Sequence, residues 1–116
     1  MKRVLIVEDE ERIRAIYSQL LREQGMEVIE AADAWEGTDA IILEKLDLVL
    51  LDLNLPQIDG KDFFTVVHEH DPEIKIMVAS VYPIEKQKSL VPQAVDYFDK
   101  SQGSEVLLQK IRKILF

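Results

Sequence analysis

The sequence alternates between strand and helix patterns five times from end to end. Each unit begins with a short apolar run rich in valine, isoleucine or leucine, and continues with apolar residues that recur at helical spacing. We expect strands at residues 4–7, 26–30, 48–53, 74–79 and 95–98, each followed by a helix. This repeating unit predicts a parallel sheet with helices on both faces, because right-handed crossovers pack each helix back onto the sheet.

The predicted fold class is α/β: a doubly wound, flavodoxin-like sheet of five parallel strands in the order 2-1-3-4-5. In this order the winding direction reverses between strands 1 and 3, and ligands bind outside the carboxyl ends of those two strands. The chain has 116 residues, of which 47% are hydrophobic, and both values suit one ordinary domain. We therefore expect residues 1–116 to form a single domain.

Acidic residues close the two strands at which the winding reverses. Glu8 and Asp9 follow the first apolar run, and Asp52 ends the third. If these runs are neighbouring parallel strands, the carboxylates meet at one edge and repel one another unless a cation or a proton intervenes. Oxygen ligands without thiolate or a nearby histidine favour a hard cation, and Mg²⁺ accepts carboxylates, waters and phosphate oxygens. The sequence predicts a magnesium site.

The composition excludes several other classes. The 22 acidic and 14 basic residues give a formal net charge of −8, so we expect no direct binding to nucleic acid or to an anionic membrane. The absence of cysteine excludes disulfides and thiolate metal sites, and fits a cytoplasmic location. No stretch approaches the roughly 18 apolar residues of a membrane helix. The first apolar run is interrupted at Glu8, too early for a signal peptide.

The last two strands can supply further groups to the same edge. Ser80 ends the fourth strand, and its hydroxyl can donate to a phosphoryl oxygen. Lys100 follows the fifth strand, and its ammonium can pair with a carboxylate or with phosphoryl oxygens. Tyr97 precedes Lys100 by three residues and can respond to movement of Ser80. With Mg²⁺ bound, one carboxylate remains free to attack a phosphoryl group and form an aspartyl phosphate.

These residues, in this order, resemble the receiver domain of two-component response regulators. The resemblance covers essentially the whole chain and depends on Glu8-Asp9, on Asp52 within Leu50-Leu51-Asp52-Leu53-Asn54-Leu55-Pro56, and on Ser80, Tyr97 and Lys100. It implies that Asp52 accepts a phosphoryl group from a histidine kinase or a histidine phosphotransfer protein. The domain would then catalyse only its own phosphorylation and dephosphorylation, and would be no enzyme for an external substrate.

The resemblance also assigns a role to each site residue. Asp9 would bind Mg²⁺ directly together with Asp52, Asn54 would contribute its backbone carbonyl, and Glu8 would act through water or as an alternative ligand. Ser80 and Tyr97 would form the switch pair. Phosphorylation would change the face made by the fourth helix, the fifth strand and the fifth helix, and so control an output domain, a downstream partner or homodimer formation.

Three positions depart from the family pattern. Ser101 follows Lys100 where proline is usual, so we expect no cis peptide bond and a less constrained loop. Val81 follows the switch hydroxyl where alanine or glycine is usual, and its branched side chain can narrow access to Asp52. Gln93 replaces a glycine. The first two departures motivate an alternative function, a pseudo-receiver that interacts with partners without phosphorylation.

A third hypothesis is a small phosphohydrolase that uses Asp52 as a transient nucleophile. It is disfavoured because Asn54 occupies the position where a general acid would be required, and no cap domain is present to bind a substrate. His68 and His70 are attributed to a surface helix end, and Trp35 to packing or partial exposure on the second helix. Phe63 and Phe64 are predicted core residues.

Overall fold

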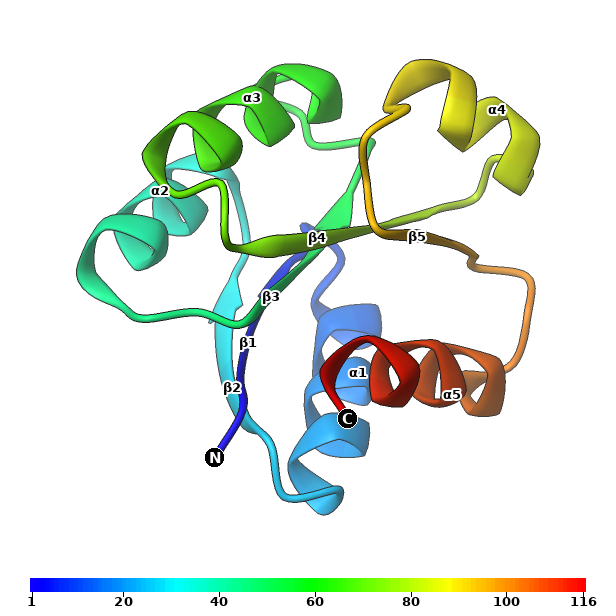
Figure 1. Ribbon diagram of the computed structural model, residues 1–116. Helices are drawn as coiled ribbons and strands as arrows, with labels where there is room; N and C mark the ends of the chain where they lie inside the picture. The colour runs from blue at the N-terminus through cyan, green and yellow to red at the C-terminus, as the bar shows by residue number, and fades with distance from the viewer.

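The computed structural model describes residues 1–116 and contains all ten expected elements (Figure 1). Their order is β1 (Arg3–Val7), α1 (Glu11–Glu23), β2 (Glu27–Ala31), α2 (Ala34–Leu43), β3 (Leu48–Asp52), α3 (Gly60–His70), β4 (Lys75–Ser80), α4 (Ile84–Leu90), β5 (Asp96–Asp99) and α5 (Ser104–Leu115). The five strands form one parallel sheet in the order β2-β1-β3-β4-β5, which confirms the predicted α/β class and the doubly wound topology.

The helices divide between the two faces of the sheet: α1 and α5 cover one face, and α2, α3 and α4 cover the other (Figure 1). Alternate residues of each strand point to opposite faces. In β1, Leu5 and Val7 pack in the larger apolar cluster under α2 and α3, whereas Val4 and Ile6 pack in the smaller cluster with α1 and α5. Burial on both faces explains why the strands are continuous apolar runs.

Glycine and aspartate residues define the end of α1 and the start of α3, close to the positions predicted from the sequence. Gly25 has a φ of 83°, a left-handed conformation that glycine adopts without steric cost, and it follows Gln24, the C-cap of α1. The Asp59 side chain caps α3 by accepting from the Lys61 amide. At Gly60, a Cβ would lie 2.8 Å from the Leu53 Cα, so a larger residue there would separate the β3 turn from α3.

Some apolar helix residues lie outside the core. Trp35 is 70% exposed, so it does not pack α2 against the sheet; the other possibility considered from the sequence was exposure. Ile16 recurs at helical spacing with other apolar residues of α1, but it is 47% exposed because Tyr17 and Leu21 provide the buried face of that helix. The predicted core residues Phe63 and Phe64 are buried. None of the helices has the length and apolar character required to cross a membrane.

Candidate phosphoacceptor site

The register of the sheet brings the predicted site residues to one edge. Val7 lies opposite Leu51, so Glu8 and Asp52 follow at neighbouring strand ends. Asp52 pairs with Ala79, and Ser80 pairs with Asp99, the residue before Lys100. The structure thus gathers Glu8, Asp52, Ser80 and Lys100 from four different strands at the carboxyl edge.

Lys100 lies between two buried carboxylates. Its Nζ is 2.5 Å from Oε1 of Glu8 and 3.4 Å from Oδ1 of Asp52. The side chains of Lys100, Glu8 and Asp52 are only 10%, 3% and 4% exposed, so solvent screens these charges weakly. The lysine therefore offsets the repulsion between the two carboxylates.

Backbone amides fix the orientation of both carboxylates. The Glu10 amide donates to Oε2 of Glu8 at 3.1 Å, and the Asn54 amide donates to Oδ1 of Asp52 at 3.0 Å. Each bond spans two residues and forms in the turn that follows the strand. Both Glu8 oxygens are therefore engaged, one by Lys100 and one by the backbone.

Burial controls the protonation of this pair. Burial disfavours the charged form of Glu8 and raises its pKa to about 7; the hydrogen bond from Lys100 opposes this effect, and the charge of Asp52 adds to it. Burial also disfavours the charged form of Lys100, but the Glu8 hydrogen bond and the Asp52 charge outweigh it, so the pKa of Lys100 lies above its ordinary value. Lys100 therefore stays charged at neutral pH, while Glu8 gains or loses its proton close to neutral pH.

The three acidic residues fit a metal site. One carboxylate oxygen from each of Glu8, Asp9 and Asp52 lies within 4.8 Å of the others. Asp9 is exposed, so it can bind an ion from solvent without breaking an existing hydrogen bond, whereas Glu8 would first have to leave Lys100 or act through water. Asn54 is exposed beside Asp52. An all-oxygen donor set suits a hard divalent cation such as Mg²⁺.

Ser80 and Tyr97 are both buried. Ser80 is 0% exposed, and its Oγ accepts a hydrogen bond from the Tyr82 amide at 3.1 Å. Tyr97 is 5% exposed, and its hydroxyl donates to the Val91 carbonyl at 2.5 Å. The ring is enclosed because Tyr97 points to the face of the sheet that α2, α3 and α4 cover, and it packs in the core cluster there.

The loop after β5 is held by its own hydrogen bonds. No peptide bond is cis, as expected for a chain with Ser101 after the lysine. Oδ1 of Asp99 accepts from both the amide and the hydroxyl of Ser101, at 2.9 and 2.8 Å, and the Gln102 amide donates to the Asp99 carbonyl at 2.9 Å. The loop that aims Lys100 is therefore constrained, contrary to our expectation, because serine supplies an N–H that proline lacks. Val81 is 65% exposed.

Two residues that contact the site region were not predicted from the sequence. Arg14 donates from Nη1 to the Glu8 carbonyl at 2.7 Å, and its Nε lies 3.5 Å from Glu30 on β2. Gln87 of α4 is fully buried; its Nε2 donates to the carbonyls of Tyr82 and Phe98 and lies 3.5 Å from the carbonyl of Ser80. A single arginine or glutamine on a helix gives no sequence signal for such contacts, because they depend on how the helix packs against the strand ends.

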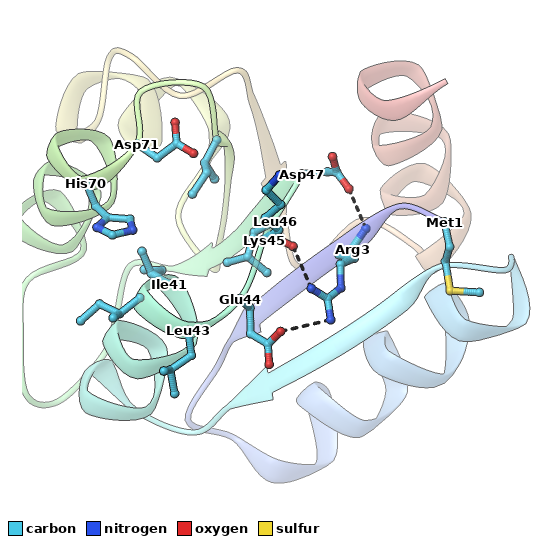
Figure 2. A pocket seen from close by; sticks show the side chains of 12 residues that line it. Met1, Arg3, Ile41, Leu43, Glu44, Lys45, Leu46, Asp47, His70 and Asp71 are labelled. Carbon is cyan, nitrogen blue, oxygen red and sulfur yellow. Dashed lines mark hydrogen bonds and ion pairs between the residues drawn. The ribbon is translucent and has the colours of Figure 1, made fainter.

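A cavity of about 570 Å³ lies at the opposite edge of the sheet, near the start of β1 and the ends of α2 and α3. Figure 2 shows its lining, with Arg3 contacting Glu44 and Asp47 while His70 and Asp71 project from the end of α3. None of the predicted site residues lines this cavity. The charged site at the carboxyl edge and this cavity are therefore separate features.

The fold and the site together define an α/β domain with oxygen ligands for a cation, a buried aspartate and a lysine at the carboxyl edge of its sheet. The family model for the response regulator receiver domain matches residues 4–112, so the chain belongs to this family. It is a receiver domain of the two-component response regulators.

Individual relatives are consistent with this assignment. The chain is 31% identical to the transcriptional regulatory protein YxdJ of Bacillus subtilis (strain 168), over 97% of this chain and 49% of that protein. It is 26% identical to the sporulation initiation phosphotransferase F of the same organism, over 98% of this chain and 94% of that protein. The chain thus spans about half the length of the first relative and nearly all of the second.

A solved structure supports the same assignment. The response regulator protein TrrA from Thermotoga maritima, in complex with Mg²⁺-BeF, superimposes with a TM-score of 0.90 at 30% identity. The match covers 99% of this chain and all of that one.

Proposed function

We propose that Asp52 is the phosphoacceptor of a Mg²⁺-dependent switch formed by residues 1–116. The observation that carries this proposal is the position of Asp52: it is buried at the end of β3, with Lys100 Nζ at 3.4 Å and the carboxylates of Glu8 and Asp9 beside it. A carboxylate held next to a cation site and a fixed ammonium can receive a phosphoryl group, because both positive charges offset the charge of that group.

The donor in this proposal is a phosphohistidine of a histidine kinase or a histidine phosphotransfer protein. An Asp52 carboxylate oxygen attacks the phosphorus atom, the phosphorus–nitrogen bond breaks, and the imidazole leaves as the neutral base after taking up a proton. Water later attacks the same phosphorus atom, which releases inorganic phosphate and regenerates the carboxylate. The bound cation supplies charge neutralisation at the phosphoryl oxygens.

The remaining site residues hold the metal ion and orient the phosphoryl group. Asp9 and Asp52, with the Asn54 carbonyl, hold the ion, and Glu8 contributes through water or as an alternative ligand. Lys100 exchanges its contact with Glu8 for the phosphoryl oxygens, and Glu8 would then be free to contribute to the ion site. Ser80 turns its hydroxyl from the Tyr82 amide to the phosphoryl group, and Tyr97 follows this movement.

The output of the switch is the face formed by α4, β5 and α5. This face carries exposed apolar side chains at Leu90 and Val95, with exposed fractions of 39% and 51%. The phosphoryl group must stabilise one arrangement of the face more than another if it is to change the affinity for an output domain, a downstream protein or a second copy. Size-exclusion chromatography with light scattering, with and without beryllofluoride, tests the dimer among these partners.

The decisive experiment replaces the acceptor. Asp52→Asn should abolish acid-labile incorporation of phosphate from a small-molecule phosphodonor and the Mg²⁺-dependent binding of beryllofluoride. The matched control is Asp39→Asn, an exposed aspartate of α2 that makes no hydrogen bond in the structure, and it should behave as the wild type. Unchanged incorporation in Asp52→Asn would refute the assignment of the acceptor.

A wild-type measurement distinguishes the switch from the pseudo-receiver. Amide chemical shifts followed during Mg²⁺ and beryllofluoride titrations should move at the carboxyl edge. They are a better probe than the fluorescence of Trp35, whose side chain is exposed on α2. Binding of neither ligand would favour an interaction module without phosphorylation.

A further inference from the structure

The buried glutamine of α4 takes no part in the proposed phosphoryl transfer. Gln87 is 0% exposed and is the only buried residue of this short helix. A glutamine is rarely enclosed in this way unless its amide is satisfied by specific partners. The hydrogen-bond partners of the Gln87 amide therefore indicate why a glutamine is buried here.

The Gln87 amide joins α4 to the ends of two strands. Nε2 donates to the Tyr82 carbonyl at 2.8 Å and to the Phe98 carbonyl at 2.9 Å, and it lies 3.5 Å from the Ser80 carbonyl. A side-chain amide has two hydrogens, and the two shorter bonds use both of them. Since Nε2 faces three acceptors, the network also fixes which end of the amide is nitrogen.

Ser80 and Gln87 hold the same residue from two sides. Oγ of Ser80 accepts from the Tyr82 amide at 3.1 Å, while Gln87 donates to the Tyr82 carbonyl. The Ser80 hydroxyl, the Tyr82 backbone and the Gln87 side chain therefore form a continuous series from the carboxyl edge to α4. A rotation of the hydroxyl that releases the Tyr82 amide acts directly on the residue that Gln87 binds.

The other end of the amide is unsatisfied. Oε1 of Gln87 is buried and has no hydrogen-bond partner. A buried acceptor without a donor costs free energy, which offsets part of what the Nε2 bonds contribute. The unpartnered Oε1 therefore reduces the free energy that would be lost if the Nε2 bonds were exchanged for others.

We propose that Gln87 is a positioning residue that holds α4 in the arrangement of the unphosphorylated domain, and that its bonds to Tyr82 and Phe98 are exchanged when Ser80 turns to the phosphoryl group. This inference rests on the proposed function and names the contact through which the site controls α4. Gln87 does not touch the phosphoryl group; it acts through Tyr82 and Ser80.

The variant that tests this is Gln87→Met, which keeps the length of the side chain and removes the amide. In the free variant, the amide shifts of α4 should move toward those of the wild type bound to beryllofluoride. The apparent affinity for beryllofluoride should rise by about 5-fold, because the hydrogen bonds no longer have to be exchanged on binding. Simple destabilisation of α4 would instead move its shifts toward random-coil values, and that result would overturn the proposal.

The matched control is Gln93→Met, the same chemical change at an exposed position between α4 and β5, and it should leave both readouts unchanged. A wild-type measurement covers the case in which Gln87→Met does not fold. The side-chain NH₂ resonances of Gln87 should be protected from solvent exchange in the free protein and should shift when beryllofluoride binds. Resonances that do not respond, in a protein that binds beryllofluoride, would overturn the inference while leaving the proposed function intact. Failure of the wild type to bind beryllofluoride would count against the proposed function and this inference together.

Discussion

The two edges of the sheet each hold a basic residue between two acidic ones, but with very different burial. At the carboxyl edge, Lys100 lies between Glu8 and Asp52, and the three side chains are 10%, 3% and 4% exposed. At the amino edge, Arg3 contacts Glu27 at 2.8 Å and Glu44 at 3.1 Å, with exposed fractions of 30%, 45% and 37%.

The difference shows how burial decides what a charged group does. Arg3 and Glu27 are open to solvent: the hydrogen bond between them raises the pKa of Arg3 and lowers that of Glu27, so both stay charged. At the carboxyl edge burial raises the pKa of Glu8 to about 7. The carboxylates there can exchange their contact with Lys100 for a proton or a cation, and Lys100 can exchange its contact with them for an anion. The solvated group stabilises the chain weakly, whereas the buried group is suited to chemistry.

Removal of Lys100 should give the largest change in the free energy of unfolding. Lys100→Met leaves two buried carboxylates facing each other, and breaking a buried pair in this way should lower the free energy of unfolding by about 3 kcal/mol at pH 8. Urea denaturation measures the change, and the loss should shrink at pH 5, where Glu8 takes up a proton. Lys113→Met, at an exposed position of α5, is the control. Equal losses in the two variants would remove the contrast between buried and solvated charges.

The next effect is a pH dependence that belongs to Glu8. The pKa of Glu8 is about 7 in the folded protein and has a reference value of 4.5. The folded state holds the Glu8 proton more tightly than the unfolded state, so protonation of Glu8 stabilises the fold. This contribution to the free energy of unfolding is complete below the pKa of the unfolded state and is lost as the pH rises through the pKa of the folded state. After allowance for solvent screening we expect a loss of about 1–2 kcal/mol between these values. Denaturation of the wild type and of Glu8→Gln across this range measures it; parallel curves would show that Glu8 does not titrate there.

A smaller effect concerns the loop that aims the lysine. Asp99→Ala removes the acceptor for both Ser101 hydrogen bonds, so phosphoryl uptake from a small-molecule donor should slow by a few-fold while the metal ligands stay in place. Ser101→Ala keeps the backbone bond and should have the lesser effect. Stopped-flow measurement of uptake compares them. Equal effects would assign the constraint to the hydroxyl bond alone, and a larger effect of Ser101→Ala would contradict the role of Asp99.

The smallest expected effect is at the amino edge. Arg3→Gln removes the exposed ion pairs with Glu27 and Glu44, and the urea midpoint should barely move because solvent already screens these charges. The remaining difference should vanish in high salt. A decrease comparable with that of Lys100→Met would break the comparison between the two edges.

The residues at strand ends were predictable because their positions follow from the chain itself. Hydrophobic periodicity and short apolar runs located the strands. The predicted order of parallel strands then placed Glu8, Asp52, Ser80 and Lys100 at one edge of the sheet, and the structure has them there. Their assigned roles stay predictions, because the geometry alone does not measure phosphorylation.

Burial and side-chain partners were not predictable in the same way. The enclosed ring of Tyr97, the bond from Arg14 to Glu8 and the buried amide of Gln87 each depend on how a helix packs against the ends of neighbouring strands, which local periodicity does not give. The Ser101 bonds to Asp99 span only two residues, yet a sequence pattern that expects proline gives no sign of them.

The helices and strands, the strand order and the set of charged residues at the carboxyl edge follow from local periodicity and from the handedness of crossovers, so they can be predicted from the amino-acid sequence. Which of these charges are paired, which are shielded from water and which helix contacts the site depend on the packed structure. These properties arise from the summed environment of each side chain, and that environment exists only when the sheet and both helical layers have packed together.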